Sequence, residues 1–189
     1  MINDLIQKNR SYRRFHQNVS IDRRTLEDLV NLARLSASGA NRQPLKYILS
    51  SEPEQNARIF PCFSWAGYLK DWDGPVEGER PSGYIIVLGD TKISTNFARD
   101  SGIACQSILL GAVEQGLGGC IIGGIDRKKL IPLLNISDQY EVLVVIALGE
   151  PGEKVVVEAV GSDGDIKYWR DSGGVHHLPK RSLDEIILD

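Results

Sequence analysis

Apolar residues recur with helical spacing in three segments of the chain. Residues three or four positions apart share one face of a helix, so each stripe predicts a helix that packs against a core. The segments are a short first helix from residue 2, a second over 22–35 that Ser20 is placed to cap, and a long apolar helix over 96–116. The stripes are Ile2, Leu5 and Ile6 in the first, Leu26, Leu29, Val30 and Ala33 in the second, and Ile103, Ala104, Ile108, Leu110 and Val113 in the third.

Capping patterns predict two shorter helices further along the chain. Asp126 precedes a helical stretch that reaches Leu134. Ser182 and Glu185 have the spacing of a capping box, which predicts a last short helix near the C-terminus.

The sequence predicts four strands, and the nearly continuous apolar run at 84–88, between Gly83 and Gly89, fits a strand that is buried on both faces. They cover residues 45–50, 84–88, 121–122 and 142–148. Two further β-prone runs between 155 and 169 flank the turn Gly161–Gly164 and predict a hairpin. Residues 71–82 hold two prolines, two glycines and several charges, which is typical of an exposed loop. The strands and helices together predict an α+β fold around a mixed sheet.

Length and composition set the broad class. A chain of 189 residues with 42% hydrophobic content is long enough for one buried core, so we expect a single domain over 1–189. The net charge of −3 does not favour a nucleic-acid partner. No apolar run reaches the roughly 20 residues of a membrane-spanning helix, and the N-terminus lacks the apolar run of a signal peptide, so we expect no membrane association and a cytoplasmic location.

The cysteines and histidines do not suggest a metal or hydrolytic site. Cys62, Cys105 and Cys120 are odd in number and widely spaced, so we expect three buried thiols rather than disulfides or a zinc site. His176 and His177 are adjacent and lack the helical spacing of metal ligands, and no histidine forms a convincing pair with a serine or cysteine nucleophile.

An arginine-rich segment follows the first helix. Arg10, Arg13 and Arg14 lie close to Ser11, and guanidinium groups match phosphate oxygens in charge and in bidentate geometry. The segment therefore suits a phosphorylated ligand. A solvated basic turn is the alternative interpretation of three arginines taken alone.

Small and amide residues follow the second helix. Asn41 and Gln43 each offer one acceptor and two donors for the edge of a flat heterocycle. Gly39 and Ala40 allow a ligand to approach the backbone closely. A ring with a phosphate tail suits this segment and the arginine segment together.

These two segments resemble the signature motifs of the FMN-dependent nitroreductase-like oxidoreductases. Members of that family open with Arg-Arg-Ser-x-Arg-x-Phe, where this chain has Asn9-Arg10-Ser11-Tyr12-Arg13-Arg14-Phe15. They continue with Ala-Pro-Ser-x-x-Asn-x-Gln-Pro, where this chain has Ser36-Ala37-Ser38-Gly39-Ala40-Asn41-Arg42-Gln43-Pro44. Asn9 and Ala37 depart from the pattern, at a phosphate-binding arginine and a loop proline respectively.

The resemblance implies a nitroreductase-like fold in which a central, mainly antiparallel sheet is surrounded by helices and two copies intertwine as a homodimer. In such a dimer FMN binds at the subunit interface, and Ser38, Asn41 and Gln43 act from the neighbouring subunit. The long helix over 96–116 corresponds to the core of the dimer interface, although core packing alone also explains its composition.

Glycines over 116–124 have two interpretations. A tight turn and a strand-end bend explain them structurally, and the run matches neither a dinucleotide-binding fingerprint nor a P-loop. In similar flavoproteins the segment matching Ile121–Gly124 lies along the isoalloxazine ring and directs a backbone N–H at its reactive nitrogen. Gly123 departs from members that carry glutamate there.

The resemblance also assigns basic residues late in the chain. Lys180 and Arg181 correspond to residues that close on the phosphate, although by themselves they predict only a surface turn. The candidate cofactor-binding residues are therefore Arg10, Ser11, Arg13, Ser38, Gly39, Asn41, Gln43, Ile122, Gly123, Gly124, Lys180 and Arg181.

The implied activity is an FMN-dependent NAD(P)H oxidoreductase that reduces a nitroaromatic, a quinone or a related small acceptor by a ping-pong mechanism. Such an enzyme needs no catalytic side chain and no metal, because the flavin carries the electrons and the protein orients it. The alternatives are a flavin-binding module without turnover and a specialised flavin-cleaving or dehalogenating relative. Trp65, Tyr68 and Leu69 are candidates for covering a flat ligand, although aromatic residues at this spacing are more often core.

Overall fold

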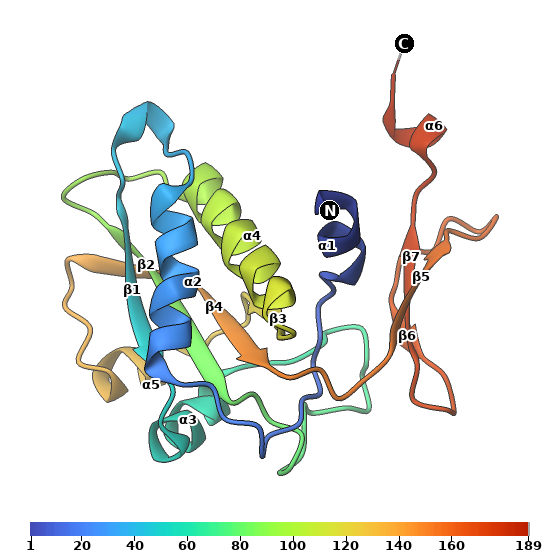
Figure 1. Cartoon of the computed structure of the whole chain (residues 1–189), viewed down its shortest axis with the longest axis horizontal. Coiled ribbons are helices and arrows are strands. Elements are labelled where there is room, and N and C mark those ends of the chain that lie inside the picture. The colour runs from blue at the N-terminus through green and yellow to red at the C-terminus, as the bar shows by residue number, and fades with distance from the viewer. Residues whose placement is uncertain (189) are drawn as a thin grey trace.

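The computed structural model describes residues 1–188 and is built around a four-stranded sheet (Figure 1). The strand order is β1-β2-β4-β3, and each neighbouring pair is antiparallel. The strands are β1 (Leu45–Ser50), β2 (Gly83–Asp90), β3 (Gly118–Ile122) and β4 (Tyr140–Gly149). The expected parallel component of this sheet is limited to a single bridge between Ser11 and Gly119 at the outer edge of β3.

Helices cover both faces of the sheet. α2 (Arg23–Leu35) and α4 (Ala98–Glu114) pack against each other on one face, and α1 (Ile2–Lys8) lies against α4. α3 (Pro53–Ile59), the 3₁₀ turn η2 (Phe60–Cys62) and α5 (Arg127–Leu133) contribute to the core on the other face. The 3₁₀ turn η1 (Gly39–Asn41) connects α2 to β1. Sequence analysis predicted α2 and α4 within two residues but missed α3.

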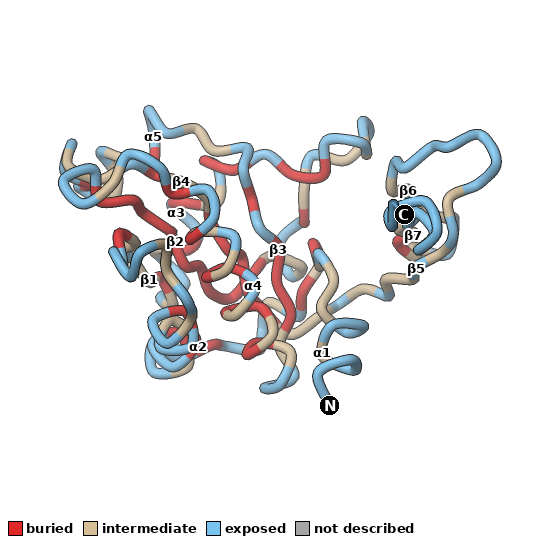
Figure 2. Tube along the Cα trace, turned by 90° about the horizontal axis from the view of Figure 1, so that it is seen from above, coloured by how far each residue is buried: buried red, intermediate tan, exposed pale blue. Residues whose placement is uncertain are grey.

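The central strand β2 explains the continuous apolar run. All eight of its residues are buried, and successive side chains point to opposite faces of the sheet. Ile85 and Val87 join the core beneath α2 and α4, whereas Tyr84, Ile86 and Leu88 join the core on the opposite face. Buried residues accordingly concentrate in the sheet and in the helices that flank it (Figure 2).

Two local predictions need correction or refinement. Asp22, not Ser20, caps α2, because its carboxylate accepts a hydrogen bond of 2.7 Å from the N–H of Thr25. The predicted cap of α6 (Leu183–Ile186) is present, with the Ser182 hydroxyl accepting from the Glu185 N–H at 3.3 Å. Cys62, Cys105 and Cys120 are buried free thiols, as expected.

Residues 154–188 form an extension that we call the C-terminal arm (Figure 1). It contains β5 (Val155–Ala159), β6 (Trp169–Arg170), β7 (His176–Lys180) and α6. The predicted hairpin over 155–169 is wrong, because β5 pairs with β7 in parallel and β6 pairs with β7 antiparallel. Gly161–Gly164 does form a turn, but the strand that completes the pairing comes later in the chain. No helix within residues 1–188 has the length and apolar character needed to span a bilayer.

Candidate functional site

The outer edge of β3 brings two of the predicted segments together. Ser11 bridges to Gly119, and the N–H of Tyr12 donates to the carbonyl of Gly119 at 3.1 Å. β3 ends at Ile122, so Gly123 is the first residue beyond the strand. The arginine segment therefore begins at one end of this edge, and the glycine pair Gly123–Gly124 lies at the other.

Gly123 leaves open space at its end of the edge. A Cβ added to Gly123 would meet no atom within 4 Å, whereas a Cβ on Gly119 would lie 2.7 Å from both the carbonyl oxygen of Ala147 and Leu109 Cδ2. The carbonyl of Gly124 accepts from the N–H of Ser64 at 2.8 Å, which fixes this end against the loop after η2. Ile122, which precedes the glycines, buries its side chain in the core.

Arg10 precedes Ser11, the residue that bridges to the outer edge of β3. One of its guanidinium nitrogens donates to the carbonyl of Ile6, near the end of α1. Its Nε is buried and has no hydrogen-bond partner among residues 1–188. The segment thus holds a buried N–H donor whose hydrogen bond is not made within residues 1–188.

Arg13 turns instead into the contact with the C-terminal arm. It is 9% exposed, and its Nη1 donates to the carbonyl of Ser11 at 3.2 Å and lies 3.1 Å from Nε2 of His176. Its guanidinium stacks 4.5 Å from the centre of the Tyr168 ring. Burial, reinforced by the charges of Arg13 and Arg170, lowers the pKa of His176 to about 4. A neutral His176 accepts from Arg13 through Nε2 and carries its proton on Nδ1.

Glu153 connects the arginine segment to the arm. Its Oε1 accepts from the backbone N–H groups of Arg13 at 2.5 Å and Arg14 at 3.2 Å, and its Oε2 lies 2.8 Å from Nη2 of Arg170. The Glu153 side chain is 2% exposed. Arg14 points away from the edge toward Glu79, with 3.2 Å between Nε and Oε2. Sequence analysis missed Glu153 and the role of His176, because neither has a local motif.

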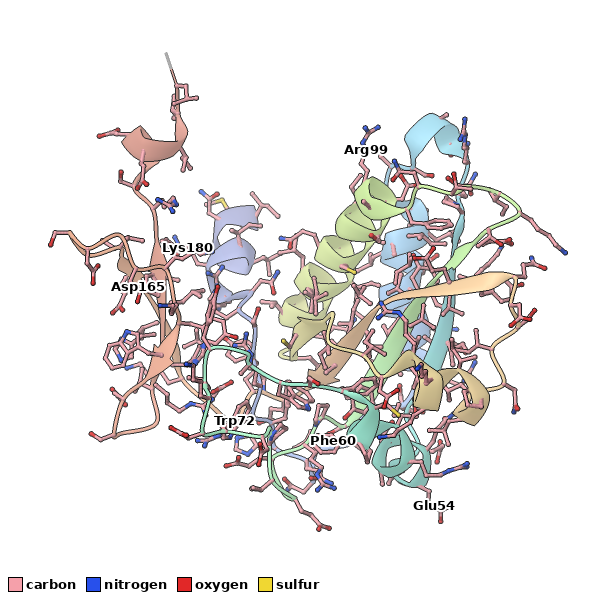
Figure 3. All side chains as sticks on the ribbon, turned by 180° about the vertical axis from the view of Figure 1, so that it is seen from behind. Glu54, Phe60, Trp72, Arg99, Asp165 and Lys180 are labelled. Atoms are coloured by element: carbon pink, nitrogen blue, oxygen red, sulfur yellow. The ribbon has the colours of Figure 1, made fainter. Side chains whose placement is uncertain are left out.

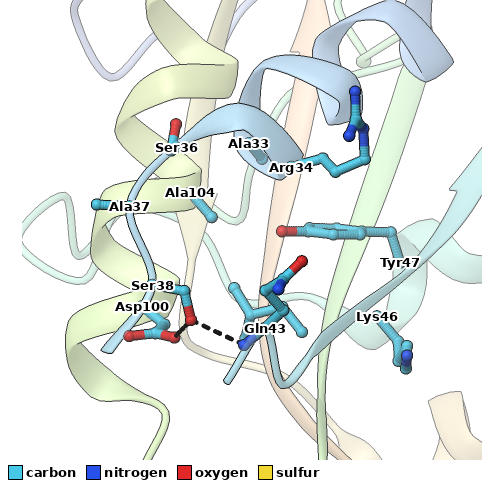
Figure 4. Close-up of a pocket in the computed structure, with 11 residues that line it drawn as sticks. Ala33, Arg34, Ser36, Ala37, Ser38, Gln43, Lys46, Tyr47, Asp100 and Ala104 are labelled. Carbon is cyan, nitrogen blue, oxygen red and sulfur yellow. Dashed lines mark hydrogen bonds between the residues drawn. The ribbon is translucent and has the colours of Figure 1, made fainter. Parts of the chain in front are cut away.

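The Ser38–Gln43 loop lies elsewhere, beside a cavity of about 210 Å³ between α2, β1 and α4 (Figure 4). Ser38 Oγ donates to Oδ2 of Asp100 at 2.6 Å and accepts from the N–H of Gln43 at 2.9 Å. The N–H of Gly39 donates to Oδ1 of Asp100 at 3.0 Å. Asn41 and Gln43 are exposed and have φ of 53° and 51°.

Within a single chain, the Ser38–Gln43 loop lies far from the outer edge of β3. The loop precedes β1, which is the opposite edge strand of the sheet, three strand spacings or about 14 Å from β3. It is held at the first turn of α4, whereas Ser11 lies beside Gly119, beyond the end of that helix. A helix of 17 residues is about 25 Å long.

Within residues 1–188, no hydrogen bond or ion pair joins Lys180 or Arg181 to Arg10. Lys180 is the last residue of β7 and lies on the arm (Figure 3). Arg181 forms an ion pair with Glu185 within the same segment. The described chain therefore places Arg10, Ser11, Ile122, Gly123 and Gly124 on the two segments that meet at the outer edge of β3. Arg13 is engaged in the contact with the arm, Lys180 and Arg181 lie on the arm, and Ser38, Gly39, Asn41 and Gln43 lie across the sheet.

Aromatic side chains connect the loop after η2 to the arm. Tyr68 is 49% exposed, and its ring centre lies 4.9 Å from that of Tyr168. Arg170 stacks 4.7 Å from the ring centre of Trp72, which projects from the 63–82 loop (Figure 3). Trp65 is 7% exposed and belongs to the core, so Tyr68 is the accessible aromatic residue of the predicted pair.

Comparison with known proteins decides the family. The family model described as Nitroreductase family matches residues 6–150, from α1 to the start of the C-terminal arm. The chain belongs to the nitroreductase family. Its first four strands and the helices between them are therefore the nitroreductase fold.

Individual relatives agree with this family. An Archaeoglobus fulgidus protein with the provisional name NADH dehydrogenase/NAD(P)H nitroreductase is 27% identical over 149 residues, which span 75% of this chain and 80% of that protein. The structure of an FMN-dependent nitroreductase from Clostridium difficile superposes with a TM-score of 0.67 at 22% identity, covering 82% of this chain and 89% of that one. A nitroreductase family protein from Streptococcus pneumoniae gives 0.71 at 19% identity over the whole of both chains.

Proposed function

We propose that the protein is an FMN-dependent NAD(P)H oxidoreductase that reduces a nitroaromatic, a quinone or a related small acceptor by a ping-pong mechanism. The observation that carries the proposal is the outer edge of β3. Ser11 and Arg10 lie at the Gly119 end, and Gly123, with open space around it, lies four residues further along the chain, just beyond the end of β3. Four residues of strand span about 13 Å, which suits a cofactor with a phosphate at one end and a flat ring at the other.

The residues at this edge fit FMN. The partnerless Nε of Arg10 is a buried donor for the phosphate, and the hydroxyl of Ser11 adds a second donor. Gly123 lacks a side chain and leaves room for the ring to approach the backbone. When bound, FMN supplies the two-electron chemistry between a nicotinamide donor and the acceptor. The chain itself positions that ring and leaves one side open to the two substrates in turn.

A homodimer completes the site in this proposal. Asn41 and Gln43 are exposed, but the β3 edge lies across the sheet from them, so these amides reach a flavin only when it is bound to another copy. Lys180 and Arg181 sit on an arm that extends from the rest of the chain (Figure 2). Exposed apolar residues at Leu35, Ile186 and Leu188 are available for a subunit interface.

Spectroscopy of the flavin-loaded protein tests the proposal. The protein is incubated with FMN and freed of unbound flavin, and its visible absorption is recorded before and after anaerobic addition of NADH or NADPH. A nitroaromatic or a quinone is then added to the reduced protein. We expect the flavin band to bleach with the nicotinamide and to return with the acceptor.

Each other outcome of this experiment contradicts a stated part of the proposal. Bound flavin that stays oxidised in the presence of both nicotinamides indicates a flavin-binding module without turnover. Flavin that bleaches but does not return with either acceptor points to a specialised relative, such as a flavin-cleaving or dehalogenating enzyme. A protein that retains no flavin contradicts the FMN assignment itself.

A further inference from the structure

Asp100 is a buried carboxylate whose only hydrogen-bond partners in the described chain are two donors of the Ser38–Gln43 loop. It is 8% exposed and lies in the first turn of α4, where the helix dipole favours a negative charge. Its two oxygens accept from Ser38 Oγ at 2.6 Å and from the N–H of Gly39 at 3.0 Å. The absence of a Cβ on Gly39 permits this approach, because an added Cβ would lie 3.3 Å from Oδ1.

The interaction continues from Asp100 into the loop. Ser38 Oγ, which donates to Asp100, also accepts from the N–H of Gln43 (Figure 4). One hydroxyl therefore ties the carboxylate to the far end of the loop. Within residues 1–188, both hydrogen bonds that leave residues 38–43 for another part of the chain end on Asp100.

The loop needs such a tether because its backbone is strained. Ala40, Asn41 and Gln43 have φ of 51°, 53° and 51°, in the left-handed region that side chains other than glycine rarely adopt. Each such residue costs about 1 kcal/mol or more and persists only where surrounding contacts hold it. The strained conformation leaves Asn41 and Gln43 exposed at the surface of the subunit.

We infer that Asp100 is a positioning residue for FMN, which it holds indirectly by fixing the loop that contacts the flavin of the neighbouring subunit. The inference rests on the proposed function and adds a residue that does not itself touch the cofactor. Its physical content is a charge-assisted pair of hydrogen bonds that selects one conformation of the amide loop.

Three variants and a control test the inference on the full-length protein: Asp100→Asn, Ser38→Ala, the double variant, and Asp22→Asn. Asp100→Asn keeps the size of the side chain but replaces one acceptor oxygen with a donor. We expect it to weaken FMN binding by about tenfold or more, the effect of losing one hydrogen bond to a charged group. We also expect it to shift the absorption maximum of the remaining bound flavin, which loss of global stability alone does not move.

The double variant shows whether Asp100 acts on FMN binding through Ser38 or whether the two residues act independently. If Asp100 acts through Ser38, the FMN affinity of the double variant is no lower than that of the single variant with the lower affinity. The reason is that the effects of coupled residues do not add. If the fold loss of FMN affinity in the double variant equals the product of the two single losses, Ser38 holds the flavin independently of Asp100, and the inference is overturned. Ser38→Ala also keeps the test valid should Asp100→Asn fail to fold.

The control changes the same chemical group far from the loop. Asp22 accepts a backbone N–H at the start of α2, and asparagine caps a helix about as well as aspartate, so Asp22→Asn makes the same carboxylate-to-amide change without touching residues 38–43. We expect its FMN affinity to stay within about twofold of the wild type. An Asp100→Asn variant with the FMN affinity and flavin spectrum of the wild type would overturn the inference but leave the proposed function standing. A wild-type protein that binds no FMN would overturn the proposed function.

Discussion

At the scale of single residues, two glycines, one in β3 and one just beyond its end, have opposite environments. Gly119 is packed between β4 and α4, where the space for a Cβ is already filled by Ala147 and Leu109. Gly123, just beyond the end of β3, has open space around it and lies outside the left-handed region. The first glycine is therefore required for packing, and the second is free to serve a ligand.

Alanine at these two positions is expected to separate stability from flavin binding. Gly119→Ala overpacks the core and should lower the free energy of unfolding by about 1–3 kcal/mol. Gly123→Ala should change it by less than about 0.5 kcal/mol but weaken FMN binding, because the new methyl group occupies the space proposed for the ring. Urea unfolding of the flavin-free variants and fluorescence titration with FMN measure the two effects. Equal FMN affinity of Gly123→Ala and wild type would argue against a ring at this position.

His176 makes stability depend on pH. Its pKa is lowered to about 4 in the folded protein, chiefly by burial, whereas the unfolded chain binds a proton below about 6.5. Between these values the unfolded state holds more protons, so the free energy of unfolding falls as the pH is lowered from 6.5 to 4, by up to about 3 kcal/mol.

The His176→Gln variant is expected to lose this contribution. Its amide oxygen can still accept from Arg13 but does not titrate, so stability should fall less steeply than in the wild type over the same pH window. Urea unfolding at several pH values between 4 and 7 gives both curves. Parallel curves for the two proteins would show that His176 takes up its proton equally in both states.

At the scale of elements, a buried carboxylate adds to the contacts that Arg13 makes between the arginine segment and the C-terminal arm. Glu153 accepts from two backbone N–H groups of that segment and pairs with Arg170 of β6. The segment that presents Arg10 and Ser11 is thereby held by the element that follows β4.

Removal of this carboxylate should loosen the arm. Glu153→Ala leaves the buried guanidinium of Arg170 and two N–H groups without their acceptor, and should cost about 2–4 kcal/mol of unfolding free energy. Limited proteolysis should then cut the arm faster than in the wild type. Asp165→Ala is the control, because Asp165 and its partner Lys167 are both exposed and such pairs contribute less than about 1 kcal/mol. Equal cleavage of the arm in both variants would contradict the role of Glu153.

The local elements could be predicted where the pattern itself carries the information. Residues 45–50 form β1 as expected, and the long apolar stripe forms α4 within two residues at each end. The partner of β5 could not be predicted, because β7 pairs with it from some twenty residues away and a local turn suggests a hairpin instead. The short helix α3 was missed because its buried face includes the polar Asn56, which bonds to Ser50 and to the carbonyl of Ser82.

The residues of the candidate site also fall into two groups, those that local sequence indicates and those that only the folded chain reveals. The arginine motif makes Arg10 and Ser11 candidates, and the family resemblance adds Gly123, because each lies in a short segment that can be matched locally. Asp100 and Glu153 are charged residues that ordinarily indicate a solvated surface, and only the folded chain shows that both are buried against backbone N–H groups. Their contributions come from contacts between distant parts of the sequence, which no local pattern records.

At the scale of the whole molecule, the proposed site is shared between two copies. The β3 edge supplies the phosphate and backbone contacts, and the Ser38–Gln43 loop supplies amides from the opposite side of the sheet. This arrangement makes flavin binding depend on association, so a variant that only weakens the dimer should also lose FMN.

The flavin content of a mixed dimer tests this arrangement most directly. One copy carries Arg10→Ala and Ser11→Ala, the other carries Asn41→Ala and Gln43→Ala, and two affinity tags isolate the dimer that contains one of each. If each site draws on two copies, the mixed dimer keeps one intact site and binds about half the FMN of the wild type, while either variant alone binds almost none. A mixed dimer as empty as its two parents would show that both segments serve the same chain, and would contradict the account.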